Sequence, residues 1–234
     1  MNKKDNDWGC NHENYYENDK VKACIVTVDD LDKIAHKLTE SVLDTSWMLG
    51  LDKGTRRSYE YTAKDTAHAL VEIFKKYTDT HELGAEFGEV MVSISSARSL
   101  SIIFDHIALP IAEIWKPQRK QNEGFDFHTE CTGCLVNFGE AKYSGSVNPH
   151  GLAIPQAERF INEEKHFRDR VHLINLTSKE SIENLDDDKY GAVAAFSINS
   201  KNHSSIMDAA ITSVRASGLF DKVQYVYLVG VVVC

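Results

Sequence analysis

The sequence has no long hydrophobic run and few cysteines. No stretch of about 20 apolar residues is present, so no membrane span is expected. Residues 1–19 lack the apolar centre of a secretory leader. The five cysteines are an odd number in a chain without an export signal, which predicts reduced thiols in the cytoplasm rather than a disulfide framework.

Positive charge is also scarce. The chain has 26 Lys and Arg against 35 Asp and Glu, for a net charge of −9. This balance argues against a general binder of nucleic acid or of anionic membranes, although it leaves room for a local basic groove. The patterns GxSxG, GxxxxGK and GxGxxG are absent, so the serine hydrolase, P-loop and dinucleotide-binding signatures are missing.

The length and apolar content suit one large domain, or one domain with an appendage. The chain has 234 residues, of which 42% are hydrophobic. Residues 1–19 are polar and predict a mobile or loosely docked arm. We expect residues 1–60 to form an N-terminal extension of strand and helix that contacts a partner, and residues 61–234 to form the main domain.

Alternating helix and strand signals predict an α/β or α+β fold with a mixed sheet flanked by helices. Helical spacing of apolar residues and runs of β-branched residues locate the elements. The predicted helices are 29–47, 61–77, 81–97, 152–169 and 203–217, and the predicted strands are 21–28, 124–131, 134–143, 191–199 and 223–233. Residues 50–58 predict a loop, and the apolar stretch around Pro110 predicts a helix before the proline and a strand after it.

The predicted strand 134–143 ends in two opposite charges, Glu140 and Lys142. Residues two apart on a strand share a face, so these side chains point the same way. Two similar triplets, 163–165 and 187–189, fall on a helix and in a solvated charge run, where this argument does not apply. Only the first triplet ends an apolar strand and has an isolated carboxylate, Asp126, on the strand before it.

Metal-assisted hydrolysis of a phosphodiester requires this set of groups. A hard cation such as Mg²⁺, or Mn²⁺, takes oxygen ligands and keeps several waters. Asp126 and Glu140 supply carboxylates, and the backbone carbonyl near Ala141 adds a third oxygen. The Lys142 ammonium is placed to orient the attacking water or to stabilise developing charge.

These residues resemble the active-site signature of the PD-(D/E)xK, or restriction-endonuclease-like, nucleases. The match consists of Asp126, thirteen intervening residues, and then Glu140-Ala141-Lys142. Phe125 stands where that signature nominally has a proline. More narrowly, GAEFGE (84–89), GFDFH (124–128) and FGEAKYSG (138–145) resemble HamA, the nuclease-subunit family of the Hachiman anti-phage defence system. That resemblance covers about residues 80–175.

The resemblance implies roles for particular residues and for partners. Asp126 and Glu140 would bind the metal, Lys142 would assist the nucleophile, and Glu89 would complete the site from the preceding helix. It also implies DNA as the substrate and a helicase subunit, HamB-like, as the partner. The residues expected near nucleic acid are Gln156, at the start of the following helix, and Lys116, Arg119 and Lys120, in the basic loop 116–124.

The connection between the two central strands decides whether the site can form. A two-residue turn at Thr132-Gly133 would pair Asp126 with Gly139, which puts Asp126 and Glu140 on opposite faces. We therefore predict a connection of odd length or a bulge, with Gly133 and Gly139 as the natural positions for it.

Alternative interpretations remain for each feature. Glu140 and Lys142 fit a solvated pair at the end of an edge strand, and Glu86 and Glu89 fit a wet helix face. The spacing of Cys131 and Cys134 is that of half a zinc knuckle, or of reduced thiols at a hairpin tip; His128 and His150 are the nearby imidazoles.

Three functions follow in order of preference. The first is a Mg²⁺-dependent DNA endonuclease subunit of a phage-defence system, controlled by a helicase partner. The second is a stand-alone restriction or repair nuclease of the same superfamily. The third is a non-catalytic scaffold that binds the helicase.

Overall fold

The computed structural model describes residues 2–18, 20–116 and 124–233, and one mixed sheet runs through them. The strand order is β1-β2-β3-β8-β7-β6-β5-β4. The central strands β3, β8, β7 and β6 are parallel, and antiparallel strands flank them on both sides. The strands are β1 (Asn2–Asp5), β2 (Cys10–Glu17), β3 (Val21–Val28), β4 (Ile107–Ala108), β5 (Phe127–Glu130), β6 (Val136–Lys142), β7 (Gly191–Ile198) and β8 (Tyr225–Val233).

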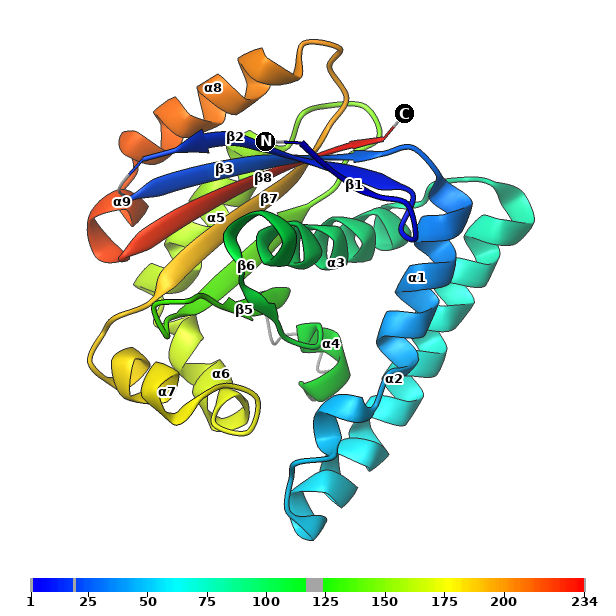
Figure 1. The fold of residues 1–234 in the computed structure, drawn as a ribbon, viewed down its shortest axis with the longest axis vertical. Coiled ribbons are helices and arrows are strands. Elements are labelled where there is room, and N and C mark those ends of the chain that lie inside the picture. The colour runs from blue at the N-terminus through cyan, green and yellow to red at the C-terminus, as the bar shows by residue number, and fades with distance from the viewer. Residues whose placement is uncertain (1, 19, 117–123, 234) are drawn as a thin grey trace.

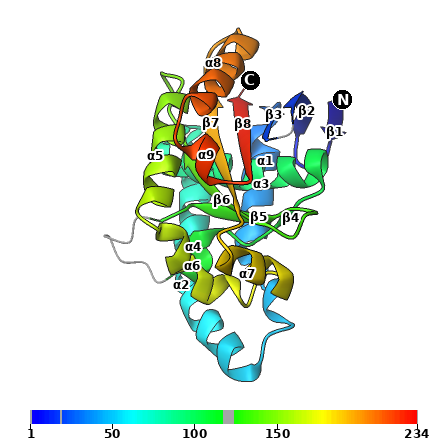
Figure 2. The same cartoon turned by 90° about the vertical axis from the view of Figure 1, so that its left-hand side faces the viewer.

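Helices cover both faces of this sheet (Figures 1 and 2). The helix α3 crosses one face with α1 and α2 packed outside it, while α5 and α8 lie on the other face. The helices are α1 (Leu31–Leu43), the 3₁₀ turn η1 (Ser46–Met48), α2 (Lys53–Thr80), α3 (Ala85–Phe104), α4 (Ala112–Trp115), α5 (His150–Asn162), α6 (Lys165–Leu173), α7 (Lys179–Asp186), α8 (His203–Arg215) and α9 (Leu219–Lys222).

The alternation of side chains along the central strands produces two hydrophobic cores. On β7, Val193 and Ala195 pack on the α3 side, whereas Ala194 and Phe196 pack on the α5 side. All eight residues of β7 are buried. Parallel strands covered on both faces have this continuous apolar character, and it explains why the predicted strands 21–28, 191–199 and 223–233 are confirmed.

The helix α3 is buried along most of its length, although Glu86 and Glu89 near its start are exposed. Its serines Ser93, Ser95, Ser96 and Ser99 are as buried as its apolar residues. Small residues on this helix allow close packing over the sheet. By length and composition alone α3 resembles a membrane span, and 67% of its most apolar window is buried inside the fold.

The prediction of a loose arm over residues 1–19 is wrong. Residues 10–17 form β2, which pairs along β3, and β1 adds to its outer edge. The side chains of Cys10 and His12 are buried, but most of the strand is polar because its outer face meets solvent. Backbone pairing with β3, rather than an apolar pattern, holds this segment in the sheet.

Three other boundaries differ from the predictions. The predicted loop 50–58 contains the start of α2, because the Asp52 side chain accepts hydrogen bonds from the N–H groups of Gly54 and Thr55. Before Pro110 the predicted helix is present as the end of α3, which runs to Phe104, but strand β4 also precedes the proline, and helix α4 rather than a strand follows it. The predicted helix 152–169 divides into α5 and α6 at Glu164, which has a left-handed φ of 55°.

Candidate functional site

The hairpin of β5 and β6 has the odd-length connection that the sequence argument requires. Three residues, Thr132 to Cys134, join Cys131 to Leu135, whose carbonyl accepts from the Cys131 N–H at 3.0 Å. The residue with positive φ is Cys134, at 53°, and not Gly133 or Gly139. Phe127 therefore pairs with Gly139, and continuing that register by one residue places Asp126 opposite Glu140. The predicted register shift is confirmed.

Asp126 lies in a bend directly before β5, and its carboxylate continues the hydrogen bonding with β6. Its Oδ2 accepts from the Ala141 N–H at 2.7 Å, where a backbone carbonyl would otherwise lie. Its own N–H donates to the Gly139 carbonyl at 2.9 Å. The flanking rings of Phe125 and Phe127 are buried in the two opposite cores, which fixes the backbone between them.

Glu140 is fully buried and is bonded through only one of its two oxygens. Its Oε1 accepts from Gln156 Nε2 at 2.5 Å and lies 2.7 Å from Lys142 Nζ. Its Oε2 has no partner among the residues that the structure describes. The sequence thus correctly grouped Glu140 and Lys142, and α5 brings Gln156 to the same carboxylate from the following helix.

Burial and mutual repulsion act together on these acids. Burial, reinforced by the charge of Asp126, raises the pKa of Glu140 to about 8 despite the contact with Lys142. Burial raises the pKa of Asp126 to about 6, although the Ala141 N–H and Lys142 oppose the change. Burial lowers the pKa of Lys142, but the surrounding carboxylates outweigh it, so the pKa stays above its usual value. The cluster carries more negative charge than one lysine neutralises.

Glu89, which was expected to complete the site from α3, has an exposed side chain. Its negative charge adds to the effect of burial in raising the pKa of Asp126, Glu140 and Glu113. The preceding residue, Gly88, explains how α3 comes so close: a Cβ atom there would lie 2.2 Å from the ring of Tyr143, which follows Lys142. The glycine therefore sets the separation between Glu89 and the end of β6.

Replacing Gly88 by alanine is expected to force α3 away from Tyr143. Overpacking of this kind costs about 1–3 kcal/mol of unfolding free energy. Gly151, in the first turn of α5, is the matched control because a Cβ atom there meets nothing within 4 Å. Gly151→Ala should stabilise the protein by about 0.5–1 kcal/mol. Chemical denaturation measures both, and equal effects of the two variants would refute the packing argument.

Glu113 is a site residue that the sequence analysis missed. Helix α4 starts where the Ala112 N–H donates to the Asp126 carbonyl at 3.0 Å, so the next side chain lies beside Asp126. Burial and the Asp126 charge raise the pKa of Glu113 to about 8, and its buried Oε2 lacks a partner in the described part of the chain. The available signal was one carboxylate inside the apolar run after Pro110.

Of the phosphate contacts predicted in the basic loop 116–124, Lys116 is the one that the structure describes. Lys116 turns inward: its Nζ lies 2.8 Å from Asp169 Oδ2 and donates to the Phe125 carbonyl at 2.8 Å. His128 Nε2 shares Asp169 Oδ2 at 2.9 Å. Lys116 is thus a structural cation behind Asp126 rather than a free phosphate contact. The other two predicted contacts, Arg119 and Lys120, lie outside the described residues.

The donor set fits a hard divalent cation. A buried carboxylate oxygen without a partner, on Glu140, lies in a cluster whose acids repel one another, and a cation would relieve both penalties. Within the described ranges no three His, Cys, Asp or Glu side chains are arranged to enclose an ion. Two carboxylates, the predicted Ala141 carbonyl and several waters would complete the set, as Mg²⁺ prefers.

The remaining candidates lie elsewhere. Cys131 and Cys134 are free thiols at the hairpin tip. His128 is engaged with Asp169, and His150 begins α5. Glu86, the alternative acid on α3, is exposed.

Comparison of the chain with protein-family models, with curated proteins and with solved structures finds no match.

Proposed function

We propose that this protein is a metal-dependent DNA endonuclease subunit of an anti-phage defence system, with a restriction-endonuclease-like core and a helicase partner. The observation that carries the proposal is the meeting of Asp126, Glu140, Lys142 and Gln156 at the end of β6, with one buried Glu140 oxygen left unpaired. The resemblance to the HamA family supplies the defence role and the helicase.

Each residue has a distinct part in the proposed reaction. Asp126 and Glu140 hold the cation, and Gln156 fixes the orientation of Glu140 through its Oε1. When bound, Mg²⁺ would lower the pKa of a coordinated water and offset charge on the phosphate. The Lys142 ammonium is held 2.7 Å from Glu140, is 20% exposed, and is placed to orient the attacking water. Glu89 adds negative charge from α3.

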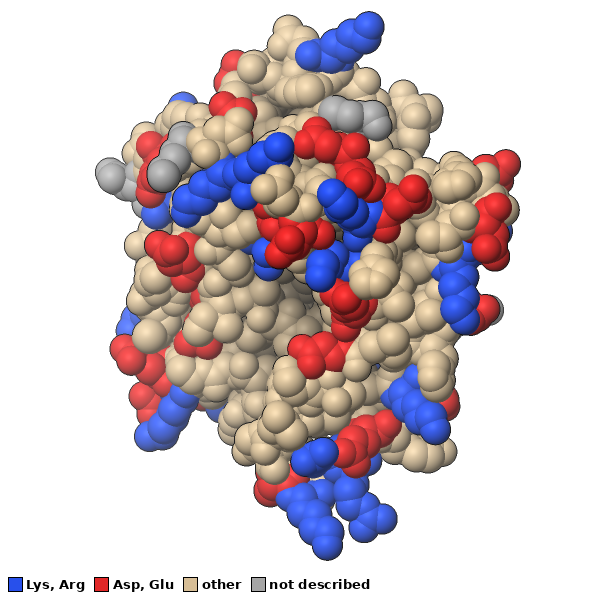
Figure 3. Space-filling model, turned by 45° about the vertical axis from the view of Figure 1, so that its right-hand side comes forward, with Lys and Arg blue, Asp and Glu red and all other residues tan. Residues whose placement is uncertain are grey.

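The surface charge supports delivery of the DNA by a partner. The net charge is −9, and the face in Figure 3 mixes acidic and basic side chains around a central hollow, without a continuous basic surface. Binding to duplex DNA depends on several Lys or Arg contacts with phosphates. An ATP-driven helicase would raise the local concentration of DNA at a site that attracts it weakly.

Plasmid cleavage with Mg²⁺ tests the proposal, with and without a co-purified helicase. The variant Lys142→Met removes the charge but keeps a long side chain, and it should cut about 100- to 1,000-fold more slowly than the wild type. Lys189→Met is the matched control, because Lys189 forms a similar ion pair with Asp187 on the exposed surface. Its cutting rate should be unchanged.

The outcomes separate the three candidate functions. Cutting only in the presence of the helicase supports the defence subunit, and full cutting by the isolated chain supports a stand-alone nuclease. No cutting under either condition, with Mg²⁺ or Mn²⁺, would refute nuclease activity and leave a non-catalytic scaffold.

A further inference from the structure

A cavity lies apart from the carboxylate cluster, on the α1 side of α3. Its volume is about 350 Å³, within the range of small-ligand sites. Segments far apart in sequence form it: the β1–β2 turn, the end of α1 with η1, the second half of α3, and residues 108–111. Its most informative lining residues are Trp8, Trp47, Arg98, Ser101, Ala108 and Pro110.

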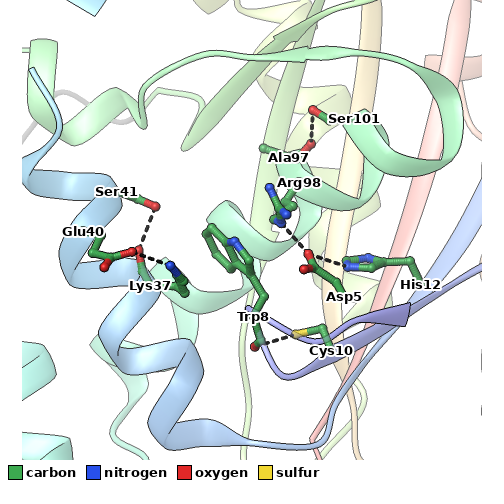
Figure 4. Close-up of polar contacts among 10 residues, drawn as sticks. All are labelled: Asp5, Trp8, Cys10, His12, Lys37, Glu40, Ser41, Ala97, Arg98 and Ser101. Atoms are coloured by element: carbon green, nitrogen blue, oxygen red, sulfur yellow. Dashed lines mark hydrogen bonds and ion pairs between the residues drawn. The ribbon is translucent and has the colours of Figure 1, made fainter. Parts of the chain in front are cut away.

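One wall of this cavity is formed by Trp8 and Arg98. The Arg98 guanidinium carbon lies 4.7 Å from the centre of the Trp8 ring. Asp5 Oδ2 accepts from Arg98 Nε at 2.5 Å and lies 3.6 Å from His12 Nε2 (Figure 4). Asp5 thus holds the guanidinium in place, and this wall offers an aromatic ring and a planar cation.

Trp47 contributes a second ring. Its ring packs edge-on against buried Tyr59, with centroids 5.3 Å apart, so its orientation is fixed. Its indole N–H is shielded from solvent, so Trp47 offers the cavity the surface of its ring rather than a hydrogen-bond donor.

The charges around the cavity select an uncharged ligand. The charge of Arg98 is matched by Asp5, and Lys37 is matched by Glu40, 2.7 Å away on α1. Asp44 also lines the cavity and adds negative charge. A phosphate would find no excess positive charge there, whereas a flat, neutral ring fits against the two tryptophans.

We propose that this cavity binds a nucleobase, either as a free nucleoside or as an unpaired base of a strand. Nucleobases stack on aromatic rings and on guanidinium planes, and Trp8, Trp47 and Arg98 line this cavity. The strand alternative rests on the proposed nuclease function, while the nucleoside alternative does not.

One segment of the chain joins the cavity to the carboxylate cluster. Ile111 lines the cavity, and the next residue, Ala112, donates its N–H to the Asp126 carbonyl. Helix α4 and Glu113 follow immediately. A base bound in the cavity therefore presses on the segment that supports two of the site carboxylates.

Tryptophan fluorescence of the full chain tests the inference. The Glu140→Gln background keeps DNA uncut, and the probes are adenosine, thymidine, a twelve-nucleotide dT strand and a duplex of the same length. We expect saturable quenching by at least one nucleoside or by the single strand. Trp47→Phe keeps an aromatic ring but removes the five-membered ring of the indole and its stacking surface, and it should weaken binding about fivefold to tenfold, followed through Trp8.

Two matched variants on one strand control for folding. Ala108→Phe fills the cavity and should abolish quenching, whereas Ile107→Phe adds a ring at an exposed neighbour outside the cavity and should leave it intact. Thermal melts establish that both are folded. Quenching by nucleosides assigns a free ligand, and quenching by the strand alone assigns an unpaired base.

Two results would overturn the inference: no saturable quenching by any probe, or equal quenching of Ala108→Phe and the parent protein. Neither result bears on plasmid cleavage, which tests the nuclease function separately.

Discussion

Glu140→Gln is expected to abolish DNA cleavage and, without divalent cations, to raise the thermal stability of the protein. Glu140 is fully buried, has one unpaired oxygen, and is repelled by Asp126 and Glu89. The neutral amide keeps the shape and removes the buried charge. At high pH the gain should be about 2 kcal/mol, which corresponds to a rise of about 4–8 °C in Tm for a chain of this size.

The pH dependence of this gain follows from the sign of the pKa change. The pKa of Glu140 in the folded protein is raised to about 8, so the carboxyl must lose its proton inside the fold as pH rises. The penalty begins above the ordinary glutamate pKa and is complete above the raised one. The stability difference between variant and wild type should therefore be small at pH 5 and largest near pH 9 in EDTA.

A divalent cation should reverse the order of stability. Added Mg²⁺ or Mn²⁺ binds only the folded site and should raise the Tm of the wild type but not that of Glu140→Gln. Glu86→Gln, an exposed change on α3, is the control and should respond to the cation as the wild type does. A Glu140→Gln protein that melts below the wild type in EDTA at pH 9 would contradict the argument that this carboxylate is held under electrostatic strain.

The local part of this site was predictable because one hairpin carries it. Glu140 and Lys142 share a face by strand geometry alone, and the requirement that Asp126 join them predicted the extra residue of the connection. The sequence placed that residue at a glycine, but Cys134 adopts the left-handed conformation instead. Face and register follow from strand periodicity, whereas the choice of turn residue depends on contacts the hairpin makes elsewhere.

The distant part of the site was not predictable in the same way. Glu113 reaches Asp126 because α4 starts on the Asp126 carbonyl, a contact between segments that local patterns do not encode. The stretch around Pro110 is apolar in both helical and strand periods, so the short strand β4 before the proline was missed and helix α4 after it was predicted as a strand. Lys116 was assigned to a solvated loop because its buried partner, Asp169, lies more than fifty residues later in the chain.

The fold, like the site, was predictable only in part. Strands β7 and β8 are apolar on both faces and were recognised from composition, because parallel strands under two helical layers need no polar face. Strand β2 has a polar sequence, CNHENYYE, and was taken for a loose arm. Its place in the sheet comes from backbone pairing with β3. Near the edge of a sheet, the pattern of side chains gives only a weak indication of such pairing.

Asp169→Ala is expected to destabilise the protein more than any surface change. Its carboxylate is 5% exposed and contacts two groups at once, Lys116 Nζ at 2.8 Å and His128 Nε2 at 2.9 Å. Burial raises the pKa of Asp169, but His128 and Lys116 outweigh it and hold the pKa below its usual value. Removing the acid leaves a cation without its buried partner, which costs about 3–5 kcal/mol.

The matched control is Asp186→Ala. Asp186 forms a bidentate contact with Arg170, and the two side chains are 42% and 33% exposed. An exposed pair contributes about 0–1 kcal/mol, so the control should melt close to the wild type.

The contribution of Asp169 to the free energy of unfolding depends on pH. Because the pKa of Asp169 is lowered in the folded protein, this contribution is present at neutral pH and is lost as pH falls through that lowered value.

Loss of Asp169 should also disturb the position of Asp126 in the carboxylate cluster. Lys116 bonds the Phe125 carbonyl, one residue before Asp126, and Asp169 holds Lys116 in that position. Asp169→Ala should therefore reduce the cation-dependent rise in Tm as well as the baseline Tm, whereas Asp186→Ala should change neither. Differential scanning fluorimetry with and without Mg²⁺ measures both effects. A lower baseline with an undiminished cation response would mean that Asp169 stabilises the fold without positioning Asp126.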